Sequence, residues 1–347
     1  MIVKDDTRPL VTGPVAAPTV SFVICCYSDE RWSLLVKAIR SCLAQDPPAR
    51  DVVVVVDYNP NLLARIKELF PTVVAVPNAG QKGLSGARNT GIANATGCLV
   101  VFLDDDAVAS PSFGARLAGP MSDPKVIGTG GMSVPAFEDT PPRWFPEEFY
   151  WTVGCTHRGV PRTAQVVRNP FGGAMAIRRE AFERVGGFRS DLGRIDAIPL
   201  GCEETEWCIR AAQATPGGIF MHEPQAVMHH FVPLKRLTWS YFFSRCLAEG
   251  YSKAMVSRFV GAEDGLSSER SYVVRVLTRG VLEGIRDTLK GDVSGLGRAA
   301  AITSGLAVTT YGYVRGRLSR AIRERVDNAG KAPPIARRYA QEGSPAG

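Results

Sequence analysis

The 347-residue sequence has few histidines, no zinc-module spacing among its cysteines and no long apolar run. Its eight cysteines include no C-x-x-C pair, which argues against a zinc module. The apolar stretch at 299–314 is too short, and too rich in Ala, Gly and Thr, for a membrane span. No basic start followed by an apolar stretch marks a secretory signal. We therefore expect a reducing cytosolic setting with free, mostly buried thiols.

The composition is that of a folded protein with a basic balance of charge. Hydrophobic residues make up 45% of the chain, which is enough for a large buried core, and no internal repeat is visible. A formal net charge of +7 suits an anionic ligand such as a nucleotide diphosphate, a phospholipid surface or a nucleic acid. Charge alone does not choose among these partners.

Short β-branched runs alternate with helical patterns through the first two thirds of the chain, which is typical of βαβ units. We therefore expect an α/β fold with a mainly parallel central sheet flanked by helices. Ligands of such sheets bind beyond the carboxyl ends of the strands. The patterns predict strands over 20–26, 52–56, 73–76 and 99–103, and helices over 30–44, 62–70 and 84–95.

Four segments are expected along the chain. They are a flexible lead-in over 1–18, an α/β domain over 19–235, a helical region over 236–330 and a flexible tail over 331–347. Within the second segment, the Pro, Gly and aromatic residues beyond position 120 predict loops and short strands that wall a binding site. An aromatic cluster there either stacks on a ligand or belongs to the core. It comprises Trp144, Phe145, Phe149, Tyr150 and Trp151.

The helical C-terminal region allows two interpretations. An apolar helix beside a basic cluster is typical of a segment that lies on an anionic membrane face. An ordinary packed helix with a solvated basic end would have the same pattern. The basic cluster that follows 299–314 comprises Arg315, Arg317, Arg320, Arg323 and Arg325.

Three consecutive carboxylates, Asp104, Asp105 and Asp106, follow the fourth predicted strand. Like charges at contact distance repel and raise one another's pKa unless a cation lies among them. Mg²⁺ or Mn²⁺, bound through one or two carboxylates plus substrate phosphates, would meet that need. Because side chains alternate along an extended segment, Asp104 and Asp106 should face one way and Asp105 the other. The alternative is an acidic turn that caps a helix near Ser110.

A glycine-rich loop over 78–89 leads into a predicted helix. Its glycines allow close approach of the backbone to a ligand, Lys82 and Arg88 supply positive charge, and the helix N-terminus favours anions. It is not a Walker loop, because no G-K-[S/T] ends it. Arg88 has an alternative role as an intramolecular partner of Asp57 or of the acidic triplet.

Six short motifs follow one another at 21–27, 56–57, 78–91, 102–106, 171–179 with 185–188, and 201–210. In this order they resemble the motifs of family 2 glycosyltransferases with the GT-A fold. The resemblance covers about residues 20–235, and it is specific because the order of the motifs is kept, whereas any one motif would be weak. It implies a nucleotide-sugar donor and a transfer that inverts the anomeric centre.

The resemblance also implies roles for single residues in a donor site. Asp57 would contact the uracil or ribose and Asp105 the ribose, while Asp104 and Asp106 form the outer pair, with Asp106 the stronger metal candidate. The glycines of the 171–179 motif would allow the backbone to approach beneath the donor sugar. The expected nucleotide-sugar site comprises Tyr27, Asp57, Lys82, Arg88, Asp104, Asp105, Gly172 and Gly173.

The segment from Glu203 to Glu206 resembles the family's acidic motif near the acceptor. Glu204 stands where the family has an aspartate, which is the expected general base. A longer side chain can take the same proton if its backbone lies further back, so the base is Glu204 or Glu203. Considered without the resemblance, the same glutamates would also suit a solvated first turn of a helix.

His230 begins a segment that resembles the family's His-any-Val-Pro pattern, which makes it a further candidate metal or phosphate ligand. His229 and His230 cannot both face the same side of an extended segment, so at most one of them points to the nucleotide. A structural role for His230 is the alternative.

These features predict a metal-dependent hexosyltransferase that uses Mg²⁺ or Mn²⁺. It would move a sugar from a donor such as a UDP-sugar to a hydroxyl of a glycan, lipid-linked or small-molecule acceptor, with no nucleic-acid partner. We expect it in the cytoplasm, with peripheral contact to the inner face of the plasma membrane through its C-terminal helices. A nucleotidyltransferase of related fold and a degenerate nucleotide-binding protein are the alternatives.

Overall fold

The computed structural model describes residues 18–193, 200–329 and 333–334. The expected N-terminal lead-in and C-terminal tail lie almost entirely outside these residues. A nine-stranded curved sheet forms the centre of the molecule, with strand order β3-β2-β1-β4-β8-β6-β9-β5 and β7 paired to β9. The eight cysteines are free, and six of them are buried, as expected.

The first four strands run parallel and follow the predicted βαβ pattern. Their bounds are β1 (Val20–Cys26), β2 (Asp51–Val56), β3 (Val74–Pro77) and β4 (Leu99–Asp104). The crossovers are α1 (Trp32–Leu43), α2 (Pro60–Leu69) and α3 (Leu84–Asn94). The helix expected to begin at residue 30 starts with a short 3-10 turn, Asp29–Arg31.

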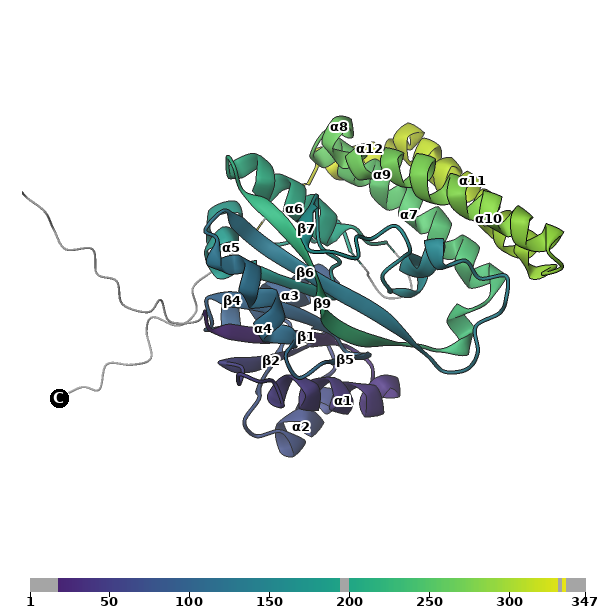
Figure 1. Ribbon diagram of the computed structural model, residues 1–347. Helices are drawn as coiled ribbons and strands as arrows, with labels where there is room; N and C mark the ends of the chain where they lie inside the picture. Colours follow the sequence, from purple (N-terminus) through teal and green to yellow (C-terminus); the bar gives the residue numbers. More distant parts are fainter. Residues whose placement is uncertain (1–17, 194–199, 330–332, 335–347) are drawn as a thin grey trace, which may run out of the picture.

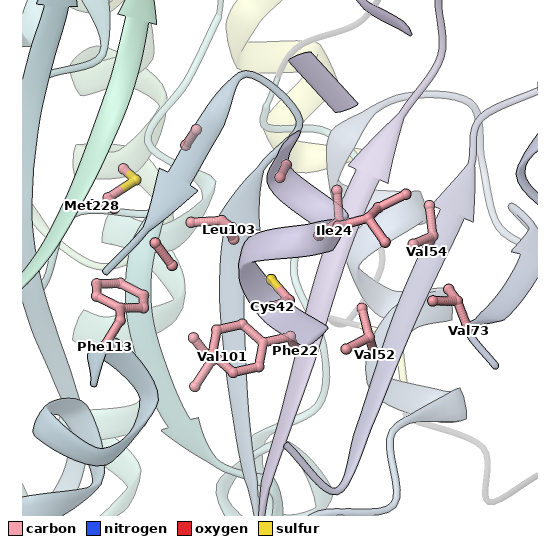
Figure 2. Close-up of a cluster of buried hydrophobic side chains, with 14 of the residues drawn as sticks. Phe22, Ile24, Cys42, Val52, Val54, Val73, Val101, Leu103, Phe113 and Met228 are labelled. Atoms are coloured by element: carbon pink, nitrogen blue, oxygen red, sulfur yellow. The ribbon is translucent and has the colours of Figure 1, made fainter. Parts of the chain in front are cut away.

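Alternating residues of the strands fill cores on both faces of this sheet. Phe22 and Ile24 of β1 pack in one core with Cys42 and Val54, as Figure 2 shows, while Val23 packs in the other core. Strands covered on both faces are the reason for continuous apolar runs such as that of β2. The carboxyl ends of β1, β2 and β4 therefore lie together at one rigid edge.

The second half of the sheet is mixed in direction. Only β6 and β9 pair in parallel there, while the pairs β4·β8, β6·β8, β5·β9 and β7·β9 are antiparallel. The expectation of a mainly parallel sheet is thus confirmed by β1 to β4 and the long β6·β9 pair, and the remaining strands add antiparallel pairs. The strands are β5 (Ala107–Ala109), β6 (Val126–Phe137), β7 (Gln165–Val167), β8 (Ala174–Arg178) and β9 (Ile219–Val232).

Strand β6 is longer than the loops and short strands expected beyond residue 120. Its glycines explain why the sequence pattern conceals it. A Cβ at Gly128 would collide with Ile177 and one at Gly131 with the Ala226 carbonyl, so the strand uses glycine for close packing. Three helices complete this half of the domain, namely α4 (Phe113–Ala118), α5 (Arg179–Val185) and α6 (Glu203–Ala214).

The C-terminal region is helical, as expected, and forms a layer at the upper right of Figure 1. Helices α10 and α11 form an antiparallel hairpin in which Gly284 faces Gly295, and α11 also packs along α7. Among the described residues, no helix has the length and apolar character needed to cross a membrane. The region comprises α7 (Trp239–Phe259), α8 (Ala262–Gly265), α9 (Ser267–Ser271), a π-helical segment (Tyr272–Leu277), α10 (Thr278–Leu289), α11 (Ser294–Leu318) and α12 (Arg320–Asp327).

Candidate functional site

The acidic triplet forms the turn between β4 and β5 at the carboxyl edge of the sheet. β4 ends at Asp104 and β5 begins at Ala107, which pairs in register with His230 of β9. This pairing places His230 beside the triplet. The two segments lie far apart in the sequence, and no local sequence pattern predicts that they meet. One ligand atom each from Asp104, Asp106 and His230 lie within 4.8 Å of one another.

The geometry around His230 fits a cation. Its Nδ1 atom lies 3.3 Å from Oδ1 of Asp106 and 3.9 Å from Oδ2 of Asp104. This buried nitrogen makes no hydrogen bond to any described residue. Two carboxylates with one imidazole are a donor set that Mn²⁺ accepts. His229 is exposed on the opposite side of the strand, so His230 is the histidine that faces the site.

Two arginines already lie among the carboxylates, and the sequence analysis missed both. Arg31 Nη1 donates to Oδ1 of Asp105 at 2.8 Å and lies 3.3 Å from Oδ2 of Asp106. Arg236 Nη2 donates to the same Asp106 oxygen at 3.2 Å, and its Nη1 lies 3.1 Å from Nε2 of His230. Repulsion within the triplet therefore does not by itself require a metal ion. The case for one rests on the grouping of Asp104, Asp106 and His230.

Asp105 is not part of that grouping, and its carboxylate accepts a hydrogen bond from Arg31. Residues 105 and 106 form a turn, so the alternation expected of an extended segment does not apply to them. Burial and the neighbouring Asp106 carboxylate raise the pKa of Asp105 to about 7, against the lowering effect of Arg31. Helix α4 begins after Ser112 without a side-chain cap, so the triplet does not form the acidic helix cap considered as its alternative.

The glycine-rich loop is attached to the end of β2. Asp57 accepts hydrogen bonds from Nδ2 of Asn78 at 2.6 Å and from the Gly83 amide at 2.9 Å. Asp57 also lines a large cavity at this edge of the sheet, whereas Lys82 is exposed and is not among the residues that line this cavity. The loop therefore positions Asp57 and the start of α3, and Lys82 lies outside the cavity lining.

Arg88 of α3 joins three parts of the site. Its Nη1 donates to Oε1 of Glu203 at 2.7 Å, and its Nη2 donates to the Gly172 carbonyl at 3.0 Å. Both side chains of the ion pair are buried. Arg88 thus has an intramolecular partner, but the partner is Glu203 rather than Asp57 or the acidic triplet.

The two glycines after Phe171 leave room for the carboxylates on either side. A Cβ on Gly172 would lie 3.1 Å from Cγ of Glu204, and one on Gly173 would collide with the Asp104 carboxylate. Glycine is therefore required here for close approach, and the same segment lies between the acidic edge and the start of α6.

Glu204, in the first turn of α6, is half-buried and lines the cavity. Burial and the adjacent Glu203 carboxylate raise the pKa of Glu204 to about 7, while Arg88 lowers it. A carboxylate with a pKa near neutrality is suited to accept a proton at physiological pH. Of the two candidate bases, Glu203 forms an ion pair with Arg88, whereas Glu204 forms none with the residues that the structure describes.

A cavity of about 1150 Å³ brings the predicted site residues together. Its lining includes the acidic triplet and Glu204. The C-terminal helices contribute further lining residues, with Tyr241, Leu277 and Leu306 among them. The aromatic cluster belongs to the core, with Phe145 and Phe149 buried in it, although Phe149 and Trp151 also line the cavity. The predicted residues that line the cavity are Tyr27, Asp57, Arg88, Asp104, Asp105, Asp106, Gly172, Gly173, Glu203, Glu204 and His230.

Two solved structures have a similar fold. The mannosyltransferase PcManGT from Pyrobaculum calidifontis, in complex with GDP-Man and Mn²⁺, matches with a TM-score of 0.53 at 18% identity, over 88% of this chain and 90% of that one. GalNAc-T7 with UDP, GalNAc and Mn²⁺ matches with a TM-score of 0.50 at 19% identity, over 74% of this chain and 54% of that one. These likenesses confirm the GT-A-type fold.

Sequence relatives agree with the fold. Residues 21–186 match the profile of Glycosyl transferase family 2. A glucosyl-dolichyl phosphate glucuronosyltransferase of Haloferax volcanii is 30% identical over 315 residues, which cover 89% of this chain and 99% of that protein. The succinoglycan biosynthesis protein ExoM of Rhizobium meliloti is 26% identical over 228 residues, covering 62% and 69% respectively. The chain therefore belongs to family 2 of the glycosyltransferases.

Proposed function

We propose that this glycosyltransferase moves a sugar from a nucleoside diphosphate donor to a hydroxyl of a lipid-linked acceptor, with inversion at the anomeric carbon. The observation that carries the proposal is the placement of Asp104, Asp106 and His230 in one cavity with Glu204. One group of residues suits the diphosphate side of a donor sugar, and the other suits the acceptor side.

The acidic edge is the proposed donor end. Asp57, at the end of β2, and Tyr27, after β1, would hold the nucleoside. Asp104, Asp106 and His230 fit Mn²⁺ or Mg²⁺, which when bound supplies positive charge that stabilises the departing diphosphate. Arg31 and Arg236 contribute positive charge at the same place. The complexes of PcManGT and of GalNAc-T7 both contain Mn²⁺, which supports this assignment.

Glu204 is the proposed general base. It would take the proton of the acceptor hydroxyl as that oxygen attacks the anomeric carbon and the bond to the diphosphate breaks. A single displacement of this kind inverts the anomeric centre. Glu203, held by Arg88, would position Glu204 and the Gly172 backbone, and would not exchange protons with the substrate.

The lipid-linked acceptor is proposed from two observations. The Haloferax volcanii relative, which this chain covers almost completely, is described as acting on glucosyl-dolichyl phosphate. The C-terminal helices line part of the cavity with apolar side chains, including Leu277 and Leu306, beside charged ones such as Lys253 and Glu269. An acceptor with both a lipid part and a polar head suits such a mixed lining.

A transfer assay tests this function. Purified protein with Mn²⁺ is offered radiolabelled UDP- and GDP-sugars together with polyprenyl-phosphate sugars, and label in the organic phase is counted. We expect one donor to give labelled lipid that depends on Mn²⁺ or Mg²⁺. Release of the nucleotide with transfer only to water-soluble glycans would refute the lipid-linked acceptor, and the absence of any transfer would refute the whole assignment.

A further inference from the structure

The outer side of α11 exposes an uncharged surface. Between residues 296 and 314, about 27 Å of helix, no exposed residue is charged. The glycines that contact α7, such as Gly305 and Gly312, lie on the opposite side of the helix. The exposed residues are Leu296, Ala300, Thr303, Ala307, Thr310, Tyr311 and Val314.

Helix α10 adds an exposed aliphatic stripe to the same hairpin. Leu282, Ile285 and Leu289 recur at helical spacing on one face, with 62%, 43% and 84% of their surface exposed. In the turn that follows, Val293 is 78% exposed. The positions that pack on α11 are instead the glycines Gly280 and Gly284. A soluble surface does not need an aliphatic stripe of this length.

Basic residues flank this surface. Residues 272–318 contain seven basic and three acidic residues. The acidic ones are already paired, since Glu283 binds Arg279 and Arg158, and Asp287 and Asp292 both bind Arg298. No described carboxylate forms an ion pair with Arg286, Lys290, Arg315 or Arg317. The hairpin therefore presents an excess of positive charge beside its apolar face.

The cavity reaches the same hairpin. Arg275, which precedes α10, and Thr310 of α11 are both exposed and both line the cavity. Tyr272 and Tyr313 line the same cavity. The donor end of the cavity, at the acidic edge, is therefore connected to the uncharged surface.

We propose that this hairpin docks the protein on an anionic lipid bilayer through a docking face made of Leu282, Ile285, Leu289, Val293, Leu296, Tyr311 and Val314. Apolar side chains enter the boundary between headgroups and acyl chains, and Arg286, Lys290, Arg315 and Arg317 contact anionic headgroups. The cavity then receives its acceptor from the bilayer past Arg275 and Thr310. This last step rests on the proposed function, whereas the docking itself does not.

Vesicle co-sedimentation of the full chain tests the docking. Vesicles of phosphatidylcholine alone are compared with vesicles that also contain phosphatidylglycerol. We expect binding to the mixed vesicles and much weaker binding to the neutral ones. Leu282→Glu/Leu289→Glu should lower the partition coefficient roughly tenfold or more. Arg286→Gln/Lys290→Gln should lower it about fivefold for each charge removed.

The matched control is Leu43→Glu/Leu69→Glu on α1 and α2, where the leucines are 43% and 45% exposed on another part of the molecule. This variant should bind vesicles like the unaltered chain. An equal loss of vesicle binding in both leucine variants, or equal vesicle binding by all variants, would show that these residues do not form the docking face. A concentration-dependent dimer that Leu282→Glu/Leu289→Glu abolishes, without vesicle binding, would assign the face to a second copy instead.

A donor readout separates this inference from the proposed function. Binding of UDP or GDP with Mn²⁺, measured by calorimetry without vesicles, should be unchanged in Leu282→Glu/Leu289→Glu, because neither leucine lines the cavity. Vesicle binding in turn needs no donor. A chain that docks but transfers no sugar would refute only the function, and a chain that transfers to detergent-dispersed lipid without docking would refute only the face.

Discussion

The Nη1 atom of Arg88 lies 2.7 Å from Oε1 of Glu203, and both side chains are buried. Since the other guanidinium nitrogen donates to the Gly172 carbonyl, one arginine connects α3, the glycine segment and the first turn of α6. A buried carboxylate that is held in an ion pair is not free to contact an acceptor hydroxyl. The relationship therefore favours the neighbouring Glu204 as the base.

Breaking this ion pair should destabilise the fold. Arg88→Met leaves Glu203 as an uncompensated buried charge, so the free energy of unfolding should fall by about 3–5 kcal/mol. Arg88→Met/Glu203→Leu removes both charges, so it should lower the free energy of unfolding by less than Arg88→Met alone does. Urea denaturation followed by circular dichroism measures both values. If the single and double variants lost the same stability, the pair would not be the connecting element.

Glu204→Gln should lower kcat by roughly 10²–10⁴-fold, because the amide cannot accept the acceptor's proton. Donor affinity should change little, since Glu204 lies beyond Gly172 from the acidic edge. Steady-state kinetics with calorimetry of the nucleotide gives both quantities. Normal turnover in this variant would show that another group is the base.

The rate should depend on pH through Glu204. Its pKa is raised to about 7 by burial and by Glu203, and only the deprotonated form can act as base. We therefore expect kcat to fall as the pH drops below about 7, and to level off above it. Measurement of kcat between mildly acidic and mildly alkaline pH checks this. A rate that stays flat down to the ordinary range of a glutamate would contradict the assignment.

His230→Asn should weaken Mn²⁺ binding, because it removes the imidazole between Asp104 and Asp106. His229→Asn is the matched control, since its side chain is exposed on the other side of β9. Thermal shift with increasing Mn²⁺ measures the effect, because a ligand that binds only the native state raises Tm. Equal metal-induced shifts in the two variants would exclude His230 as a ligand.

Gly173→Ala should damage the donor end of the site. Its Cβ would collide with the Asp104 carboxylate, which must move to make room, so both metal affinity and kcat should fall. Gly119→Ala is the control, because a Cβ there has no neighbour within 4 Å. Unchanged metal affinity in Gly173→Ala would show that Asp104 is not held in place by this contact.

Local patterns predicted the N-terminal half of the fold well. The apolar runs of β1, β2 and β4 need cover on both faces, and the polar residues that follow them mark the carboxyl edge of the sheet. Asp57 and the triplet could therefore be placed together from sequence alone. Strand β6 could not be recognised, because glycines at 128, 130 and 131 are typical of loops as well as of close packing.

Contacts between residues far apart in the sequence could not be predicted from local patterns. Arg31 and Arg236 reach the triplet across 74 and 130 residues, and nothing near either arginine marks it as a partner. His230 was found only through the family resemblance, because its position depends on the register of β5 with β9. Lys82 was expected in the donor site for its charge, but it lies outside the cavity lining.

The most direct test of the account is anomalous diffraction at the manganese edge from crystals soaked with MnCl₂ and UDP or GDP. We expect one strong peak between Asp104, Asp106 and His230, with the diphosphate on its open side and Glu204 facing the space beyond. A peak elsewhere with that position empty, or a nucleotide bound away from Asp57 and the acidic edge, would contradict it.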